Sequence, residues 1–300
     1  MTSVPIAEPP PRQSPGRWLS TFLFRHPRLR LAALLALPVG WLVLVYIGSL
    51  VFLLLSAFWT TDPFTSEVVR ELTLDNIRRI AETPVYRDVA WRTVQMAAMV
   101  TIADAILAFP LAYYMARVAS PRTRNLLVVA ILLPLWASYL VKVYAWRVIL
   151  QEEGILNWSL EPIGLSGPGF GNVATWLVFS YLWLPFMILP VYAGLERIPN
   201  SLLEASGDLG AKSLRTLWRV VLPLAVPAIA AGSIFTFSLT LGDYITPALV
   251  SSTQFIGNVV YINVGVANNL PFAAAFATVP VVVMVVYLLL ARRAGAFESL

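Results

Sequence analysis

Two aspartates, Asp104 and Asp243, lie within long apolar stretches and are the side chains best placed for chemistry inside a membrane. A carboxylate there could line a path for a cationic solute, or it could hydrogen-bond a neighbouring helix and fix the packing. For Asp104 both interpretations stay open. Gly242 and Pro247 predict a distorted helix around Asp243, whose loose amides the carboxylate could satisfy, so the structural interpretation is favoured there. Tyr244, which follows, is grouped with the two aspartates as a candidate for the path.

Side chains that bind metals or act as nucleophiles are scarce in this chain. Cysteine is absent, and the single histidine, His26, lies among arginines near the amino terminus. This composition argues against disulfides, metal sites and histidine-based catalytic triads. Gly207–Ser213 faintly resembles a phosphate-binding loop, but that motif needs glycine directly before the lysine, and Ala211 stands there. We therefore expect no catalytic residue, no metal site and no nucleotide or other cofactor in this chain.

The composition is that of a helical membrane protein. Of 300 residues, 58% are hydrophobic and 12% are charged, and the mean hydropathy is +0.75. A soluble domain carries about twice this charged fraction. The net charge of +5 could indicate nucleic-acid binding, but in a membrane chain the positions of the basic residues matter more than their sum. We expect an all-α, polytopic protein in the lipid bilayer, with no nucleic-acid partner.

Six apolar stretches, each near or above the twenty or so residues that cross a bilayer, predict six transmembrane helices. Proline interrupts most of them, which favours a transporter that moves over a simple anchor. Residues 31–293 are expected to form a single transmembrane domain, between a disordered cytoplasmic tail at 1–30 and a short cytoplasmic tail at 294–300. The predicted spans are residues 31–59, 90–116, 126–150, 173–195, 224–250 and 272–291.

The basic residues predict the orientation of these spans. Fourteen lysines and arginines fall in the segments that an even number of spans places on one side, and five fall in the segments on the other. Basic residues favour the cytoplasmic side. We therefore expect both termini in the cytoplasm, together with the segment between the fourth and fifth spans.

That segment, residues 201–223, is polar and basic. Ser201 is expected to cap a short helix, and Gly207 and Gly210 are expected to break it or to let a partner surface approach its backbone closely. A second short helix follows, and Leu222-Pro223 is expected to turn the chain back to the bilayer. Two short helices with a bend form a knob rather than a pocket, so the segment predicts a docking site for a partner. The alternative is an interfacial amphipathic loop without a partner.

The same segment resembles the cytoplasmic "EAA" loop of binding-protein-dependent ABC importer permeases. The likeness rests on Glu204-Ala205, on Gly210, and on Val220, Leu222 and Pro223 after nine intervening residues. Ser206 stands where that family usually repeats alanine. The resemblance implies that the knob seats in a groove of an ATPase subunit and transmits its motion. The residues it assigns to coupling are Glu204, Ala205, Ser206, Gly207, Gly210, Lys212, Leu222 and Pro223.

A wider likeness covers roughly residues 72–290 and is to permeases of the spermidine/putrescine type. It rests on five runs, at residues 72–77, 133–147, 241–250, 257–260 and 271–275. Ser251-Ser252 departs from it, because many relatives have paired glycines there. The resemblance implies the type I ABC importer permease fold in a bacterial inner membrane. It also implies three kinds of partner chain: a second permease, two copies of an ATPase that binds ATP and magnesium, and an extracytoplasmic binding protein.

Three alternatives remain at this level. The same machine could carry another solute, such as ferric iron, an opine or another small organic ion, because selection is largely made by a separate binding protein. The chain could instead be a carrier driven by an ion gradient. It could also be a membrane-embedded enzyme, which would need an acid–base pair or metal ligands within the membrane.

Overall fold

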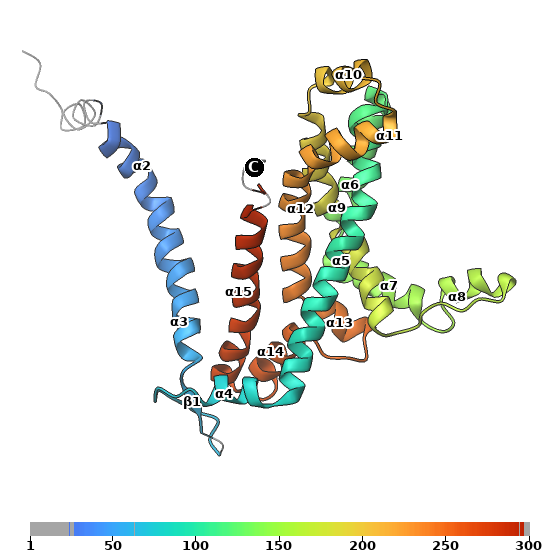
Figure 1. The fold of residues 1–300 in the computed structure, drawn as a ribbon. Helices are drawn as coiled ribbons and strands as arrows, with labels where there is room; N and C mark the ends of the chain where they lie inside the picture. Colours follow the sequence, from blue (N-terminus) through green and yellow to red (C-terminus); the bar gives the residue numbers. More distant parts are fainter. Residues whose placement is uncertain (1–23, 25–26, 63, 294, 297–300) are drawn as a thin grey trace, which may run out of the picture. The chain divides into compact units, whose positions relative to one another are not determined.

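The computed structural model describes residues 24, 27–62, 64–293 and 295–296. Most of the two tails predicted at 1–30 and 294–300, His26 included, lies outside these described residues. Contacts divide the chain into two compact units, residues 1–55 and 56–300. Within the described part both units are built from helices, and the second also contains a two-stranded hairpin (Figure 1).

The first unit is one long apolar helix. It comprises α2 (Pro27–Trp41), a π-helical segment η1 (Leu42–Ile47) and α3 (Gly48–Ser56). No described side chain from residue 27 to residue 55 is buried. Such a helix is stable only where its surface meets lipid or other apolar groups. The first predicted span is confirmed as a helix long enough to cross a bilayer.

The second unit opens with a small hairpin and a surface helix. Strands β1 (Thr60–Thr61) and β2 (Val68–Val69) pair antiparallel, and α4 (Asp75–Glu82) follows. One carboxylate oxygen of Asp62 accepts hydrogen bonds from the amides of Phe64 and Thr65. These bonds favour the charged carboxylate and hold the pKa of Asp62 below its ordinary value.

Three helices form the core of the second unit. They are α5 (Pro84–Arg117), α9 (Asn172–Glu196) and α12 (Leu222–Gly242), and they have the most extensive mutual contacts of any helices in the described chain. Their predicted spans, residues 90–116, 173–195 and the first part of 224–250, are therefore confirmed as helices. Small residues are what allow such helices to approach closely in a membrane.

The contact between α9 and α12 shows this directly. A Cβ atom on Gly194 would lie 2.3 Å from the Cβ of Ala228. One turn or two further along, a Cβ on Gly232 would lie 2.9 Å from the sulfur of Met187. Neither position has room for a side chain, so α9 and α12 lie backbone against backbone and form a stiff pair.

The third predicted span, residues 126–150, is wrong as a single straight helix. Helices α6 (Pro121–Trp136) and α7 (Tyr139–Leu150) meet at an angle of 93°. Ala137 and Ser138 between them have extended backbone angles. Proline in a membrane helix is compatible with a kink or with a full break. Here the break is complete: α6 ends at Trp136, two residues after Pro134.

An outer arm follows α7. It contains α8 (Ile155–Leu160) and the short 3-10 helix η2 (Glu161–Ile163). Asn157 holds the arm together, because its amide nitrogen donates to the carbonyl of Gln151 and its oxygen accepts from the amide of Gly167. The glycine-rich stretch at 167–171 is thus a loop, and the hydrogen bond to Asn157 fixes its first residue to α8.

The fifth predicted span, residues 224–250, differs from the structure at both ends. A single helix of 30 residues runs from Ser213 through α11 (Ser213–Thr216) and the π-helical η3 (Leu217–Val221) to the end of α12. The chain then breaks at Asp243, and α13 (Ile245–Val250) is a separate short helix. Helices α14 (Ile256–Gly265) and α15 (Leu270–Arg293) complete the unit.

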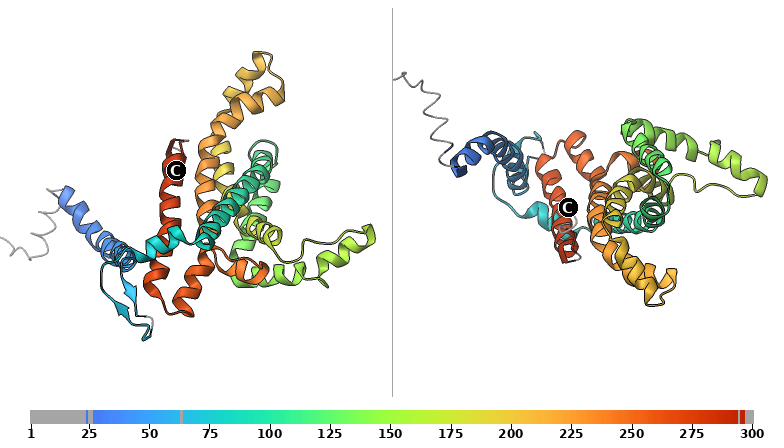
Figure 2. Two further views of the ribbon diagram at one scale, coloured as in Figure 1. Left: turned by 60° about the horizontal axis from the view of Figure 1, so that its bottom comes forward. Right: turned by 90° about the horizontal axis from the view of Figure 1, so that it is seen from above.

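Within the described residues, five helices are long and apolar enough to cross a membrane, or six if the bent α6–α7 pair counts as one span. The prediction of six spans is therefore reached only with the broken one. In the second unit, α10 (Asn200–Asp208) and α11 stand at one end, whereas α4, α13 and α14 lie at the other (Figures 1 and 2). The last turn of α15, with Arg292 and Arg293, points to the same end as α10 (Figure 1).

Candidate functional site

The segment at 201–223 folds as two helices that project beyond the end of α12 (Figure 2). Gly210 makes the turn between them with a φ of 77°, a left-handed conformation that favours glycine. The hydroxyls of Ser206, on α10, and Thr216, on α11, lie 2.9 Å apart and join the two helices. The predicted bend between two helices is confirmed, and α10 is short as expected, but the second helix is not a separate short one because it continues into α12. The Ser206 hydroxyl helps to hold the two helices together.

Three local expectations for this segment are wrong. Ser201 does not cap α10, because the N-cap residue is Pro199 and no side chain caps the helix. Gly207 lies inside α10 and does not break it. Leu222 and Pro223 do not turn the chain, because they lie within the continuous helix from η3 into α12. The wider π-helical turn of η3 precedes Pro223, and such a turn tolerates a residue that lacks a backbone N–H.

The surface of the knob carries large apolar side chains beside basic ones. Leu209 is 89% exposed, Leu214 67% and Trp218 62%. Lys212 and Arg215 line a hollow of about 450 Å³ together with Gly210, Leu214 and Trp218. Large apolar side chains that cluster on a polar surface mark a site where another surface docks. Glu204 and Ala205 are also exposed on α10.

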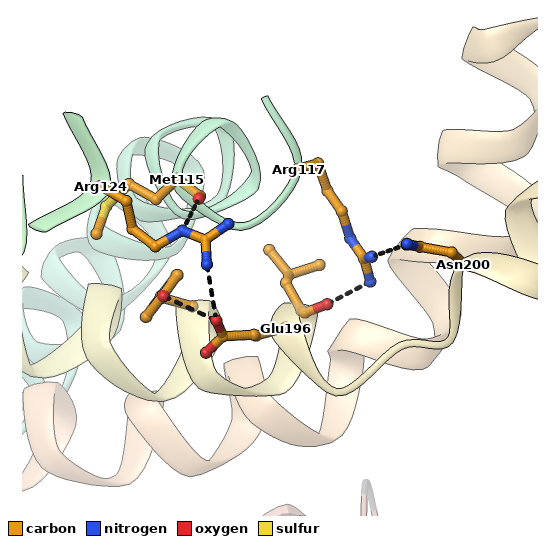
Figure 3. A network of polar contacts seen from close by, with 7 residues as sticks. Met115, Arg117, Arg124, Glu196 and Asn200 are labelled. Atoms are coloured by element: carbon orange, nitrogen blue, oxygen red, sulfur yellow. Dashed lines mark hydrogen bonds and ion pairs between the residues drawn. The ribbon is translucent and has the colours of Figure 1, made fainter. Parts of the chain in front are cut away.

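Two arginines hold the base of the knob, and Figure 3 shows both. The guanidinium of Arg117, at the end of α5, donates to the side-chain oxygen of Asn200 at 2.7 Å. It also donates to the carbonyls of Leu195, at 2.5 Å, and Ile198, at 2.6 Å. These carbonyls lie at the carboxyl end of α9, where helix carbonyls have no partner within the helix. Arg117 therefore ties α5 to the joint between α9 and α10.

Arg124, on α6, adds a second tie. Its Nε donates to the carbonyl of Met115 at 3.1 Å, and its Nη1 lies 3.2 Å from a carboxylate oxygen of Glu196 (Figure 3). The hydroxyl of Tyr192 donates to the same oxygen. We name the set Arg117, Arg124, Glu196 and Asn200 the loop-base network. From the sequence alone, these arginines only predicted the orientation of the spans. The acidic residue at the end of the fourth span was the signal that could have paired them.

Inside the membrane segment, Asp243 is fully hydrogen-bonded. One oxygen accepts from the amides of Ile245, at 2.8 Å, and Thr246, at 3.1 Å. The other accepts from the hydroxyls of Tyr139, on α7, and Thr246. The carboxylate thus satisfies amides freed at the helix break, as the structural interpretation of Asp243 predicted. It also links the break in the fifth span to the break in the third.

The region around Tyr244 is built on close backbone contact. The amide of Asn258 donates to the carbonyl of Tyr244 at 2.8 Å. A Cβ on Gly257 would lie 2.7 Å from the carbonyl oxygen of Asp243, so only glycine fits there. The ring of Tyr244 stacks on that of Tyr261 with centroids 4.7 Å apart. Both rings line an apolar cavity of about 350 Å³ between α12, α14 and α15.

Asp104, on α5, differs from Asp243 in its hydrogen bonding. Its side chain is fully buried, and neither oxygen has a hydrogen-bond partner in the described part of the chain. The hydroxyl of Ser180, on α9, faces it. Among the described residues, no hydrogen bond joins Asp104 to Asp243, so the two carboxylates do not form one pair. The described residues also contain no group of three or more His, Cys, Asp or Glu side chains placed to hold a metal ion.

Residues 108–296 match the family described as the binding-protein-dependent transport system inner membrane component. The chain belongs to this family. It is 48% identical over 311 residues to the inner membrane ABC transporter permease protein YdcU of Escherichia coli K12, an alignment that covers 98% of this chain and 99% of that protein. It is 32% identical to the spermidine/putrescine transport system permease protein PotB of the same organism, over 86% of this chain and 94% of that protein.

Solved structures of ABC importer permeases share the fold of this family member. A bacterial alginate ABC transporter in complex with an alginate-bound periplasmic protein matches with a TM-score of 0.71 at 17% identity, over 94% of this chain and 98% of that chain. The MetNI methionine ABC transporter matches with a TM-score of 0.54 at 17% identity, over 70% of this chain and 94% of that chain. The expected all-α fold of type I ABC importer permeases is confirmed.

Membership of the family also gives the general role of the chain. It is a permease of the ABC importer class, and so a transport subunit rather than a catalytic one. With its apolar helices and its inner membrane relatives, it is a multi-pass protein of the inner membrane.

Proposed function

We propose that this permease imports a polyamine of the spermidine/putrescine type, in a complex driven by ATP. The proposal is supported by the PotB proteins, whose names state this transport and which align over most of both chains. Another solute of the same importer class, such as ferric iron, an opine or another small organic ion, is the alternative. The alginate and methionine transporters of similar fold illustrate how widely solutes vary on one architecture.

The observation that carries the coupling part of the proposal is the knob at 201–223. A partner ATPase, which binds ATP and magnesium, docks on its exposed apolar and basic surface. Glu204, Ala205 and Lys212 lie on that exposed surface. Ser206 and Gly210 maintain the shape of the knob, through the contact between the hydroxyls of Ser206 and Thr216 and through the turn at Gly210. Gly207 lies exposed within α10, where the partner can approach its backbone. The chain itself needs no cofactor for this role.

Leu222 and Pro223 have a different part in this scheme. They lie inside the helix that runs for 30 residues from Ser213 to Gly242. At 1.5 Å per residue this helix is about 45 Å long. It connects the knob to the break at Asp243 without interruption, so a displacement of the knob moves the far end of α12. Differential contact of the ATPase with two arrangements of this helix is what allows ATP to drive transport.

The remaining partners follow from the same scheme. A second permease completes the path across the membrane, two ATPase copies grip the two permeases, and a binding protein delivers the solute. In this proposal the knob and both termini face the cytoplasm. The binding protein docks on the opposite end, around residues 60–89 and 150–171, where α4 and α8 lie.

Gly210→Trp tests the coupling. A bulky residue must adopt a φ of 77° there, which strains the backbone, and its ring would disturb the docking surface. We expect ATP hydrolysis and uptake to become uncoupled in proteoliposomes that contain the full complex, while insertion into the membrane is retained. Gly295→Trp is the matched control, because Gly295 has a φ of 78° and lies outside the knob. Normal uptake by the Gly210 variant would refute the docking scheme.

Co-expression with the ATPase and uptake assays separate the remaining alternatives. We expect the ATPase to purify with the permease and to be lost when residues 201–223 are replaced by a flexible linker. Uptake that continues without ATP would favour a carrier driven by an ion gradient. Competition among unlabelled polyamines, ferric iron and opines for uptake of labelled spermidine identifies the solute class.

A further inference from the structure

The proposed function leaves one group in the membrane interior without a role. Asp104 is 0% exposed, and both of its oxygens lack a hydrogen-bond partner in the described part of the chain. Ser180, on α9, is 7% exposed, and its hydroxyl is the one neighbouring group placed to donate to Asp104. Buried polar groups are nearly always paired, so a buried carboxylate with at most one neighbouring hydroxyl needs an explanation.

The nearby threonines have no hydroxyl proton to offer Asp104. Thr101, one turn before Asp104, donates its hydroxyl proton to the carbonyl of Ala97 at 2.7 Å. Thr236, on α12, lies 3.4 Å from the Thr101 hydroxyl and also contacts the carbonyl of Ser233. Both hydroxyl protons are therefore engaged, and the hydroxyl of Ser180 can fill only one of the lone-pair positions of the carboxylate. A ligand suited to the remaining positions is one that donates.

No positive charge in the core helices compensates the carboxylate. Helices α9 and α12 contain no lysine or arginine, and α5 contains none between Arg92 and Arg117. Each of these two arginines lies at least twelve residues from Asp104 along α5, or about 18 Å at the rise of a helix. Arg92 donates to the carbonyl of Gln254, and Arg117 belongs to the loop-base network. An uncompensated carboxylate in a dry interior is costly, and such residues mark ion and substrate pathways.

The contrast with Asp243 shows which carboxylate has capacity left. Asp243 already accepts four hydrogen bonds, from two amides and two hydroxyls. A carboxylate has about four lone-pair positions, so Asp243 is full. Asp104 has at most the hydroxyl of Ser180 beside it, so most of its positions are open to a ligand.

We propose that Asp104, with Ser180 beside it, binds an ammonium group of a cationic solute as it passes between α5, α9 and α12. The inference rests on the proposed function, because it concerns the path of the imported solute. The ammonium brings three N–H donors and one positive charge, which match the open acceptors and the missing counter-charge. Because Asp104 is closed off in this arrangement of the helices, it binds the solute when α5 and α9 move apart.

The test uses the complete transporter in proteoliposomes. ATP is supplied on the side of the membrane that the knob faces, and labelled spermidine and the binding protein are supplied on the opposite side. Asp104→Asn keeps the shape of the side chain and removes its charge. We expect spermidine uptake to fall at least tenfold, while ATP hydrolysis stimulated by the binding protein stays within twofold of wild type. Asp104→Glu, which restores the charge, should recover part of the uptake. Spermidine uptake at the wild-type rate by Asp104→Asn would overturn the proposal.

Two further arms keep the inference testable. If Asp104→Asn fails to assemble, Ser180→Ala removes only the neighbouring hydroxyl, and we expect uptake to fall several-fold with the complex intact; unchanged uptake would count against the site. If wild type takes up no polyamine, the proposed solute is wrong, and the site is judged with the solute that the binding protein does deliver. A cation whose uptake depends on Asp104 supports the site, whereas an anion, or a cation carried equally well by Asp104→Asn, refutes it.

Discussion

Replacing Arg117 should loosen the base of the knob more than replacing Arg124. Arg117 makes three hydrogen bonds, one exposed bond to a side chain and two partly buried bonds to helix carbonyls. A hydrogen bond from a charged donor contributes about 1.5–3 kcal/mol when it is shielded, and less when water competes. With about 1 kcal/mol for each partly buried bond and about 0.5 for the exposed one, Arg117→Gln should cost about 2–3 kcal/mol locally.

Arg124 and Glu196 form a more exposed pair. Their side chains are 32% and 49% exposed, and an ion pair of this kind contributes less than about 1 kcal/mol. The local cost of Arg124→Gln should therefore be about 1 kcal/mol, even with its bond to the carbonyl of Met115 included. The local cost of Arg117→Lys should lie between those of Arg117→Gln and Arg124→Gln, because a single ammonium cannot reach all three oxygens that the guanidinium of Arg117 contacts.

Hydrogen exchange of the amides in residues 195–208 measures this difference. A local cost of about 2 kcal/mol raises the population of the open state, and so the exchange rate, about 30-fold. Arg122→Gln is the matched control, because Arg122 lies with Arg124 in the first turn of α6 and its side chain has no hydrogen bond or ion pair within the described residues. Equal exchange in Arg117→Gln and wild type, or a larger effect from Arg124→Gln, would refute the assignment. The amount of solute taken up per ATP hydrolysed should fall most in Arg117→Gln, less in Arg117→Lys and least in Arg124→Gln.

Three further predictions concern other contacts. Gly194→Ala should lower the free energy of unfolding of the detergent-solubilised protein by about 1–3 kcal/mol, because the added methyl would lie 2.3 Å from the Cβ of Ala228 on α12. Gly207→Ala is the control and should have little effect, because no atom lies within 4 Å of the added methyl. Tyr139→Phe should cost about 1–3 kcal/mol, because Asp243 loses a donor in the membrane interior. The folded protein lowers the pKa of Asp62 below its ordinary value of 3.8. The charged carboxylate therefore stabilises its turn fully at pH values above 3.8, and this stabilisation is lost as the pH falls through the lower pKa of the folded state. Amide exchange of the turn between pH 5 and 2 should therefore accelerate toward acid more in wild type than in Asp62→Asn.

Hydropathy predicted most of the fold because the bilayer imposes a length on each span. The runs at 90–116 and 173–195 lie within α5 and α9, whose ends extend only a few residues beyond them. The knob could be located for the same reason, since a polar segment between two such runs must lie outside the membrane. Its shape was predictable in outline from Gly210, which supplies the positive φ that the turn requires.

The two breaks could not be predicted from the local sequence. Pro134 precedes the break between α6 and α7, whereas Pro223 lies in a helix that continues past it. Proline removes one hydrogen bond in each case, and neighbouring groups decide whether the helix bends, widens into a π-turn or stops. At Asp243 the deciding group is the hydroxyl of Tyr139, more than a hundred residues away in the chain.

The loop-base network was missed for a related reason. Basic residues near a membrane surface carry a topological signal, and that signal alone accounts for their presence. Arg117 and Asn200 are separated by 83 residues, and only the packing of α5 against α9 brings them together. Once that packing is known, the carbonyls at and just beyond the end of α9, which have lone pairs to spare, identify the arginine as their partner.

These features assign stiffness and movement to different parts of the chain. The knob is joined to α5 by the loop-base network and to α12 by an unbroken helix, and α12 lies backbone against backbone with α9. A displacement of the knob therefore cannot be absorbed at the base of the knob or along the α9–α12 pair. It must be taken up where the helices stop, at Asp243 and at the turn before Tyr139, which a single carboxylate joins. A change in the hydrogen bonds at this junction is thus the mechanical consequence of a pull on the knob. The same displacement must part α5 from α9 for Asp104 to meet a solute.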